Sequence, residues 1–349
     1  MSPRDQPAAQ ALLEVRSLSL RFGGLTAVDR VSFQVFPGEI VSVIGPNGAG
    51  KTSLFNAITG LHPPSAGEVL IQGRRLRRAL DAWTCLRWLG VGVLTAIGLG
   101  IGTDLLGLWA VSGVQDYAAP EHFPWSASAH AVLQELAGSG WVHGGALVGF
   151  VLGIAGAVAV WRRTRQEPEV AVRSGIARTF QNIRLFKELS VLDNVLVGLD
   201  ARSRCGGLAA VVRTPRQRRE ERAVRAGALE LLTQVGLGAV AGAPAGSLPY
   251  GHQRRLEIAR ALACSPRILL LDEPAAGMNP TEADELIGLI RTIRERGVTV
   301  LLIEHHMRVV MGISDRIVVL HFGRPIAEGV PEVVRHDSAV IAAYLGADP

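Results

Sequence analysis

The feature that most constrains this chain is a window of 74 residues, Trp88 to Trp161, that contains no Lys or Arg. The whole chain carries 36 basic residues in 349, so a window of this length would be expected to hold about eight. All six tryptophans fall between Trp83 and Trp161, and the mean hydropathy of the chain is positive, +0.26. A composition that changes so abruptly predicts a separate apolar segment inserted into an otherwise ordinary globular chain.

Two runs inside the window are long and apolar enough to cross a lipid bilayer. Residues 88–111 form a run of 24 with a single charge, Asp104. As a helix this run would measure about 36 Å, against a hydrocarbon core of roughly 30 Å. Residues 142–160 form a second run of 19 without a full charge. The sequence therefore predicts two transmembrane helices; the alternative is a soluble, glycine-rich helical hairpin that covers the rest of the chain.

The distribution of charge predicts how this hairpin is oriented. Arginines cluster on both sides of the window, whereas the connecting residues, about 112–141, carry acidic charges and no Lys or Arg. By the positive-inside rule, both ends of the hairpin lie in the cytoplasm and residues 112–141 lie outside. We therefore expect the inner (cytoplasmic) membrane as the location. Basic clusters that border an apolar segment favour membrane lipid, and no nucleic acid, as a partner.

Small residues indicate how the two helices pack. The second run has a stripe of them at four-residue spacing, which suits close helix packing: Gly145, Gly149, Gly153 and Ala157. Gly98 and Gly102 of the first run are the residues expected to face this stripe.

Two details near the predicted membrane stay open. Asp104 is expected near the outer interface, where it is either simply solvated or an intramembrane acid with a function. Leu76, Leu80 and Trp83 could lie on the membrane with the arginines of residues 74–78 facing lipid phosphates. An ordinary exposed helix is the alternative for that segment.

The apolar window lies between two motifs that are both typical of nucleotide-phosphate binding sites. Residues 45–52, GPNGAGKT, match the pattern GxxxxGK[ST] between an apolar strand-like run and a helical one. Glycines let backbone N–H groups converge on phosphate oxygens, the Lys reaches the β- and γ-phosphates, and the Thr hydroxyl binds Mg²⁺. A chance glycine turn is the alternative. The candidate nucleotide ligands are Gly45, Pro46, Asn47, Gly48, Ala49, Gly50, Lys51, Thr52 and Ser53, with Thr52 also a metal ligand.

After the window, Asp272 and Glu273 end an apolar run. A carboxylate at the end of a buried strand can hold Mg²⁺ and its neighbour can polarise an attacking water; the alternative is a pair of carboxylates that only cap a strand. Asp272 is thus a candidate metal ligand. Because Lys51 and Glu273 would serve one cytosolic site, the number of membrane crossings between them must be even, which two helices satisfy.

Further segments make the pattern more specific. In chain order they are RFGG with Phe22, the phosphate loop, RTFQN with Gln181, SLPYGHQRRLEIARAL, LLLDEPAAGMNP, LLIEHH with His305, and the tail AYLG. In this order they resemble the ATP-binding cassette (ABC) ATPases and, within them, the ATPase subunit of branched-chain amino acid importers. The resemblance covers nearly all of residues 12–74 and 170–347.

The resemblance implies an α/β fold, a P-loop NTPase domain of the ABC type with a mainly parallel sheet and a helical lobe. We expect residues 12–74 to form its first part and residues 168–349 its second. Residues 75–167 would be the insert with the two-helix transmembrane hairpin.

The resemblance also implies roles for single residues. Glu273 would be the catalytic base, Gln181 would contact Mg²⁺ and the attacking water, and His305 would hold the γ-phosphate. Phe22 would stack on the adenine. Each has a plainer alternative: a core phenylalanine, a satisfied loop amide, or a histidine that ends a strand.

The signature segment departs from the family pattern. Tyr250 and Gly251 would close over the γ-phosphate of an ATP bound to a second subunit. Pro249 replaces the usual serine and offers neither a hydroxyl nor an N–H to a phosphate. Asn279 occupies a position that is usually acidic. Since the base, the lysine and the metal ligand are retained, we expect an active ATPase.

The expected function is ATP hydrolysis, with ATP and Mg²⁺ as cofactors, in an importer of branched-chain amino acids or related small polar solutes. The partners implied are a sister ABC ATPase as heterodimer, or a homodimer, two permease subunits and an extracytoplasmic solute-binding protein. Two alternatives stay open. One is a membrane-anchored ABC ATPase that remodels or regulates a membrane complex without transport. The other is an exporter ATPase for lipid or polysaccharide.

Overall fold

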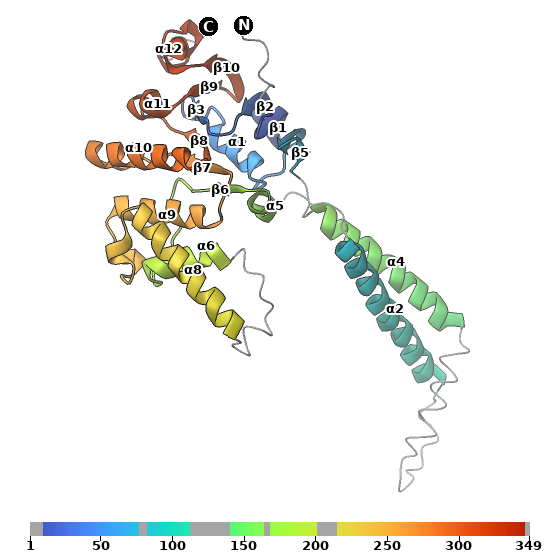
Figure 1. The fold of residues 1–349 in the computed structure, drawn as a ribbon. Coiled ribbons are helices and arrows are strands. Elements are labelled where there is room, and N and C mark those ends of the chain that lie inside the picture. Colours follow the sequence, from blue (N-terminus) through green and yellow to red (C-terminus); the bar gives the residue numbers. More distant parts are fainter. Residues whose placement is uncertain (1–9, 77–81, 112–139, 164–167, 201–214, 346–349) are drawn as a thin grey trace, which may run out of the picture. The chain divides into compact units, whose positions relative to one another are not determined.

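The computed structural model describes residues 10–76, 82–111, 140–163, 168–200 and 215–345. The chain divides into two compact units (Figure 1). Residues 1–76 and 166–349 form the first unit, and residues 77–165 form the second.

A mainly parallel sheet forms the centre of the first unit. Its order in the described part of the chain is β10-β9-β3-β8-β7-β6, and only β10 runs antiparallel to its neighbour. β3, β7 and β8 are buried at every position, which explains their continuous apolar runs, because helices cover both faces of such a sheet. The bounds are β3 Ile40–Ile44, β6 Ile176–Arg178, β7 Ile268–Asp272, β8 Thr299–Ile303, β9 Arg316–His321 and β10 Arg324–Gly329.

A second, antiparallel sheet was not foreseen as a separate layer. Its order among the described residues is β2-β1-β4-β5. A tight turn at Gly23, with φ of 58°, joins β1 to β2. The bounds are β1 Leu13–Phe22, β2 Leu25–Val35, β4 Ala66–Ile71 and β5 Arg74–Arg75.

Helix α1 (Lys51–Ile58) joins the two sheets into one core. It buries Leu54, Phe55 and Ile58 against residues of both sheets. Leu76 belongs to the same core and is only 8% exposed, so the suggestion that it lies on the membrane is wrong. The other helices of this part are α5 Pro168–Arg173, α10 Pro280–Glu295, α11 Met307–Ile313, α12 Pro331–Val334 and α13 Ser338–Leu345.

A helical lobe follows β6 in the chain. Val191, Leu232 and Leu256 are fully buried in a core of its own. Together with the mainly parallel sheet, this lobe confirms the expected α/β class. Its elements are α6 Val191–Asp200, α8 Pro215–Gln234, the 3₁₀ turns η2 Gly238–Val240 and η3 Ala245–Ser247, and α9 Tyr250–Ala263.

The second unit pairs two long helices, α2 (Ala82–Val111) and α4 (Gly140–Arg163). Thr95 of α2 donates a hydrogen bond of 2.8 Å to the carbonyl oxygen of Gly149 on α4. A Cβ on Gly149 would lie 2.4 Å from the carbonyl oxygen of Thr95, and one on Gly153 would lie 2.1 Å from its Oγ1. These two glycines are therefore what allows α4 to approach α2 so closely.

The partners expected for this stripe were wrong. Among the residues that the structure describes, a Cβ on Gly98 or Gly102 would meet no neighbour within 4 Å. Gly92 and Thr95 occupy the contact instead, since a Cβ on Gly153 would lie 3.0 Å from the Cα of Gly92.

The outer surface of this pair of helices is apolar. Trp83, Leu94, Leu147 and Val160 are between 62% and 74% exposed. Ala82–Gly100 and Gly144–Trp161 are long and apolar enough to cross a membrane, with only 6% and 17% of each segment buried. Leu80, residues 112–139 and the side chain of Asp104 lie outside the described part.

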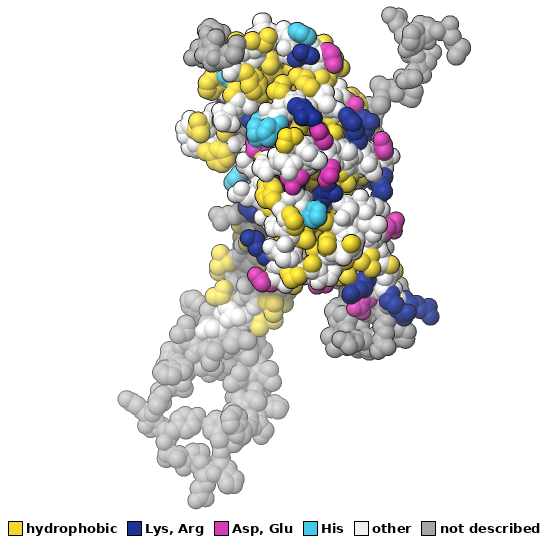
Figure 2. Space-filling view, turned by 90° about the vertical axis from the view of Figure 1, so that its left-hand side faces the viewer, with side chains coloured by type: hydrophobic (Ala, Val, Ile, Leu, Met, Phe, Trp, Pro, Cys, Tyr) yellow, Lys and Arg dark blue, Asp and Glu magenta, His cyan; other side chains and the backbone are white. Residues whose placement is uncertain are grey.

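Charge is mixed on the face of the first unit that Figure 2 shows. Basic and acidic side chains alternate there over short distances, with hydrophobic ones between them. This visible face carries no extended region of one sign.

Candidate functional site

The phosphate loop leaves the end of β3 and enters α1, and two of its glycines lie against backbone carbonyl groups of other segments. Gly45 has φ of 152°, and a Cβ there would lie 2.1 Å from the carbonyl oxygen of Leu320. Gly50 has φ of 93°, and a Cβ there would lie 2.2 Å from the carbonyl oxygen of Ala27. Both positions therefore require glycine for close backbone packing as well as for their dihedral angles.

Lys51 is buried at the start of α1 and folds back over this loop. Its Nζ donates to the carbonyl oxygens of Gly45 at 2.7 Å and Pro46 at 3.0 Å. Burial lowers the pKa of Lys51, while the carboxylates of Glu273 and Asp272 oppose that shift. The ammonium group therefore lies in the loop, within the electrostatic influence of both carboxylates.

The remaining loop ligands differ in exposure. Asn47, Gly48 and Thr52 are exposed, and Pro46 and Ser53 are half-buried. The hydroxyl of Thr52 is thus accessible to a ligand.

Asp272 ends β7 next to this loop. Its Oδ2 accepts a hydrogen bond of 2.7 Å from Nη2 of Arg178. Its Oδ1 is buried and has no hydrogen-bond partner among the described residues. Burial raises the pKa of Asp272, and the guanidinium of Arg178 lowers it in opposition. A buried carboxylate oxygen without a partner fits a Mg²⁺ ion or its water, because hard cations prefer oxygen ligands.

Arg178 was not among the residues chosen from the sequence. It lies at the end of β6, and its Nη1 also donates to Oδ1 of Asn56 at 2.7 Å. Its guanidinium lies 5.6 Å from the ring centre of Phe55 and 5.3 Å from that of Phe180. The sequence signal was its place three residues before Gln181; the pairing of its strand with that of Asp272 appears only in the folded chain.

Two of the three candidate catalytic residues, Gln181 and His305, lie next to the carboxylate of the third, Glu273. Nε2 of Gln181 donates to Oε2 of Glu273 at 3.0 Å, and Nδ1 of His305 lies 3.6 Å from the same oxygen. Glu273 has φ of 46°, a left-handed conformation that is uncommon outside glycine and concentrates at functional sites. Its N–H donates to the carbonyl oxygen of Ile303 at 2.9 Å, which fixes this turn.

Glu304, also missed from the sequence, holds the segments around this cluster. It is fully buried. Its Oε1 accepts from the N–H of Ala275 at 2.9 Å, and its Oε2 accepts from the N–H groups of His305 at 3.2 Å and His306 at 3.4 Å. One carboxylate thus connects the chain after Glu273 to the chain that carries His305.

The signature helix α9 is connected to the segment of Gln181. Arg254 and Glu257 form a buried ion pair of 2.7 Å. Arg254 donates to the carbonyl oxygens of Phe180 at 2.7 Å and Gln181 at 2.8 Å. Glu257 accepts from the N–H of Phe180 at 3.2 Å. These hydrogen bonds connect the Gln181 segment directly to α9.

Other predicted ligands lie apart from this cluster. Phe22 is 45% exposed, and its ring makes an edge contact of 5.4 Å with His62. The hydroxyl of Tyr250 accepts from Arg254 at 3.4 Å, and a Cβ on Gly251 would lie 3.2 Å from Glu282. Within the described residues, no hydrogen bond or ion pair joins Tyr250 or Gly251 to the phosphate loop.

The two departures from the family pattern have local structural roles. Pro249 precedes α9 as its N-cap without a side-chain hydrogen bond. Asn279 caps α10: its Oδ1 accepts from the N–H of Glu282 at 2.9 Å, and Glu282 accepts in return from the N–H of Asn279 at 3.1 Å. This capping box fixes the start of the helix.

Comparisons with known proteins agree with this geometry. The family described as ABC transporter matches residues 28–94 and 146–276, and the family described as branched-chain amino acid ATP-binding cassette transporter matches residues 324–349. The high-affinity branched-chain amino acid transport ATP-binding protein BraF of Pseudomonas aeruginosa is 38% identical over 339 residues, 97% of this chain and 99% of that protein. LivG of Escherichia coli K12, described in the same words, is 35% identical with the same coverage.

A solved structure supports the fold alone. The crystal structure of the ADP conformation of an ATP-binding cassette of an ABC transporter has a TM-score of 0.63 and 24% identity. The match covers 96% of this chain and 99% of that one. Family matches, relatives and fold agree, and the chain belongs to the ABC transporter family as an ATPase of its branched-chain amino acid group.

Proposed function

We propose that this chain is the ATP-hydrolysing subunit of an importer for branched-chain amino acids or related small polar solutes. The observation that carries the proposal is the convergence of Gln181 and His305 on the carboxylate of Glu273. The influence of the Glu273 and Asp272 carboxylates on the pKa of Lys51 supports a single site for the phosphate loop and these carboxylates. The two relatives named above are transport ATP-binding proteins, which supports the choice of solute.

In the proposed mechanism the chain binds and orients ATP before it moves a proton. The loop N–H groups and Lys51 hold the phosphates, and Phe22 stacks on the adenine. Oδ1 of Asp272 and the hydroxyl of Thr52 would hold Mg²⁺, which neutralises phosphate charge when it is bound. Glu273 accepts the proton of the attacking water, Gln181 orients that water, and His305 donates to the γ-phosphate.

The signature segment completes the site of a second subunit in this proposal. Tyr250 and Gly251 belong to the start of α9, where the first N–H groups of a helix point outward toward an anion. Pro249 leaves those groups without a side-chain cap. We infer a dimer, with a sister ATPase or with a second copy, in which Gly251 contacts the phosphate bound by the partner's loop.

The second unit is proposed to anchor the ATPase in the inner membrane, with residues of about 112–141 outside. Its exposed apolar side chains support this, because a soluble hairpin would bury them. Two permease subunits and an extracytoplasmic solute-binding protein would complete the importer, and the hairpin would dock beside the permeases.

Replacement of the base tests the catalytic assignment. Glu273→Gln keeps the size of the side chain but removes its ability to accept a proton, so ATP turnover should fall by about 10²–10⁴-fold while ATP binding is retained. The matched control is Glu295→Gln, the same change at an exposed position near the end of α10. Turnover equal in both variants would refute the role of Glu273.

The transport assignment is tested by its partners and its solute. Affinity purification from detergent-solubilised native membranes should recover two multi-span permeases and an ATPase partner. Cells that carry Lys51→Ala should lose uptake of labelled leucine, isoleucine and valine. Recovery from membranes without permeases, and unchanged uptake, would favour the membrane-anchored ATPase without transport.

A further inference from the structure

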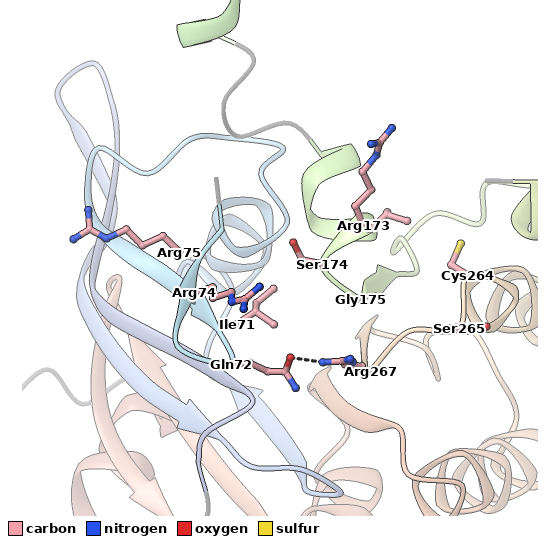
Figure 3. A pocket seen from close by; sticks show the side chains of 11 residues that line it. Ile71, Gln72, Arg74, Arg75, Arg173, Ser174, Gly175, Cys264, Ser265 and Arg267 are labelled. Carbon is pink, nitrogen blue, oxygen red and sulfur yellow. Dashed lines mark hydrogen bonds between the residues drawn. The ribbon is translucent and has the colours of Figure 1, made fainter. Parts of the chain in front are cut away.

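A cavity lined by arginines lies in the first unit, lined by β5, α5 and the chain that leads into β7 rather than by residues of the catalytic cluster. Its volume is about 760 Å³, in the range of sites that hold small organic ligands. Figure 3 shows its lining, with Arg74 and Arg75 from β5, Gln72 from the turn between β4 and β5, Arg173 from the end of α5, and Ser174 directly after that helix. Arg267, just before β7, donates a hydrogen bond to Oε1 of Gln72 across it (Figure 3).

The cavity is positively charged. Of the described residues, four arginines and no Asp or Glu line it: Arg74, Arg75, Arg173 and Arg267. Glu68 pairs with Arg75, and Glu169 pairs with Arg173 at 2.7 Å. Four positive charges less these two negative ones leave a formal charge of +2. This positive charge is complementary to the negative charge of a phosphate group.

Arg74 and Arg267 are the two cations that a ligand would find unpaired. Among the described residues, neither forms an ion pair with a carboxylate, and Arg267 meets only the neutral amide of Gln72. Planar guanidinium groups bind phosphate oxygens through two parallel N–H donors. The hydroxyl of Ser174 lines the same cavity and can donate a further hydrogen bond.

The cavity is lined by the elements through which the chain enters and leaves the apolar hairpin. β5 ends at Arg75 and the second unit begins at Arg77; the second unit ends at Arg165 and α5 begins at Pro168. Both covalent connections to the hairpin thus leave from elements that line the cavity. Basic pockets beside membrane segments on the cytoplasmic side attract anionic headgroups.

We propose that this cavity is a binding site for a phosphate group carried by an anionic lipid headgroup. Its volume admits a glycerol as well as a phosphate, and its charge discriminates against zwitterionic headgroups. The lipid source rests on the membrane hairpin proposed above, whereas the phosphate chemistry does not. Neither depends on ATP hydrolysis.

The test uses the full-length protein in a neutral detergent with saturating MgADP, so that the phosphate loop is occupied. Binding of dioctanoyl phosphatidylglycerol, dioctanoyl phosphatidylcholine and inorganic phosphate is titrated by calorimetry. The variant is Arg74→Gln with Arg267→Gln. The matched control removes the same two charges at exposed positions away from the cavity, Arg30→Gln with Arg335→Gln. Equal ADP affinity in both shows that each variant is folded.

We expect saturable binding of phosphatidylglycerol, weakened at least tenfold in the cavity variant and less than twofold in the control, with little binding of phosphatidylcholine. Inorganic phosphate that binds as tightly as phosphatidylglycerol, with the same loss in the variant, would support the phosphate site and refute the lipid source. Absence of saturable binding, or equal weakening in variant and control, would overturn the proposal. For each variant, ADP affinity and ATP turnover test the ATPase function independently of the proposed lipid site.

Discussion

Replacement of Arg178 tests how strongly its ion pair with Asp272 stabilises the site. Its side chain is 6% exposed and that of Asp272 is 1% exposed, with 2.7 Å between Nη2 and Oδ2. Arg178→Met keeps an unbranched side chain of similar length but leaves a buried carboxylate without its counter-charge. Breaking a buried pair from one side costs about 3–5 kcal/mol of unfolding free energy. For a domain of this size that lowers the melting temperature by roughly 6–20 °C.

The loss should depend on pH in a direction that identifies Asp272 as its cause. Burial already holds the pKa of Asp272 above its usual range, and Arg178 acts to lower it, so its removal raises that pKa further. A carboxyl whose pKa is higher in the folded state than in the unfolded state raises the free energy of unfolding at low pH, where it is protonated. That stabilisation is lost as the pH rises through the folded-state pKa. The deficit of the variant against the parent should therefore be larger at pH 8 than at pH 5.

Thermal unfolding of the full chain in detergent, followed by circular dichroism at both pH values, measures this. The control is Arg308→Met, whose pair with Asp284 is 73% and 52% exposed and should cost less than about 1 kcal/mol. A deficit that equals the control, or that is the same at pH 5 and pH 8, would refute the argument. Arg178→Lys keeps the charge but cannot reach Asp272 and Asn56 together, so an intermediate loss is expected.

Two further predictions follow from backbone geometry and from the division into units. Gly45→Ala should abolish ATP binding, because its Cβ would lie 2.1 Å from the carbonyl oxygen of Leu320. The control is Gly48→Ala, where a Cβ meets no described atom within 4 Å, and it should retain more ATP binding despite its φ of 81°. Equal loss of ATP binding in both variants would contradict the packing argument. Replacement of residues 77–165 by a short linker should leave nucleotide affinity unchanged and reduce membrane association in fractionation; loss of nucleotide binding would show that the hairpin is needed by the first unit.

The parts of the site that could be predicted from the sequence are those formed by consecutive residues. The phosphate loop and the Asp272–Glu273 pair are short motifs whose neighbours in space are also neighbours in the chain. Arg178 escaped because its partners lie far away in sequence, 94 residues to Asp272 and 122 to Asn56. Such a contact depends on which strands adjoin, and the order β8-β7-β6 is not visible in any local pattern.

The hairpin shows the same limit inside a single supersecondary unit. The stripe of small residues on α4 correctly indicated close packing, because a helix repeats its surface every 3.6 residues. Which part of α2 meets the stripe depends on the rotation of α2 about its own axis and its shift along α4. Neither quantity is fixed by a sequence of almost uniformly apolar residues, so Gly98 was chosen although Gly92 and Thr95 make the contact. At the observed alignment the hydroxyl of Thr95 lies 2.8 Å from the carbonyl oxygen of Gly149, the same distance as from that of Val91 in its own helix.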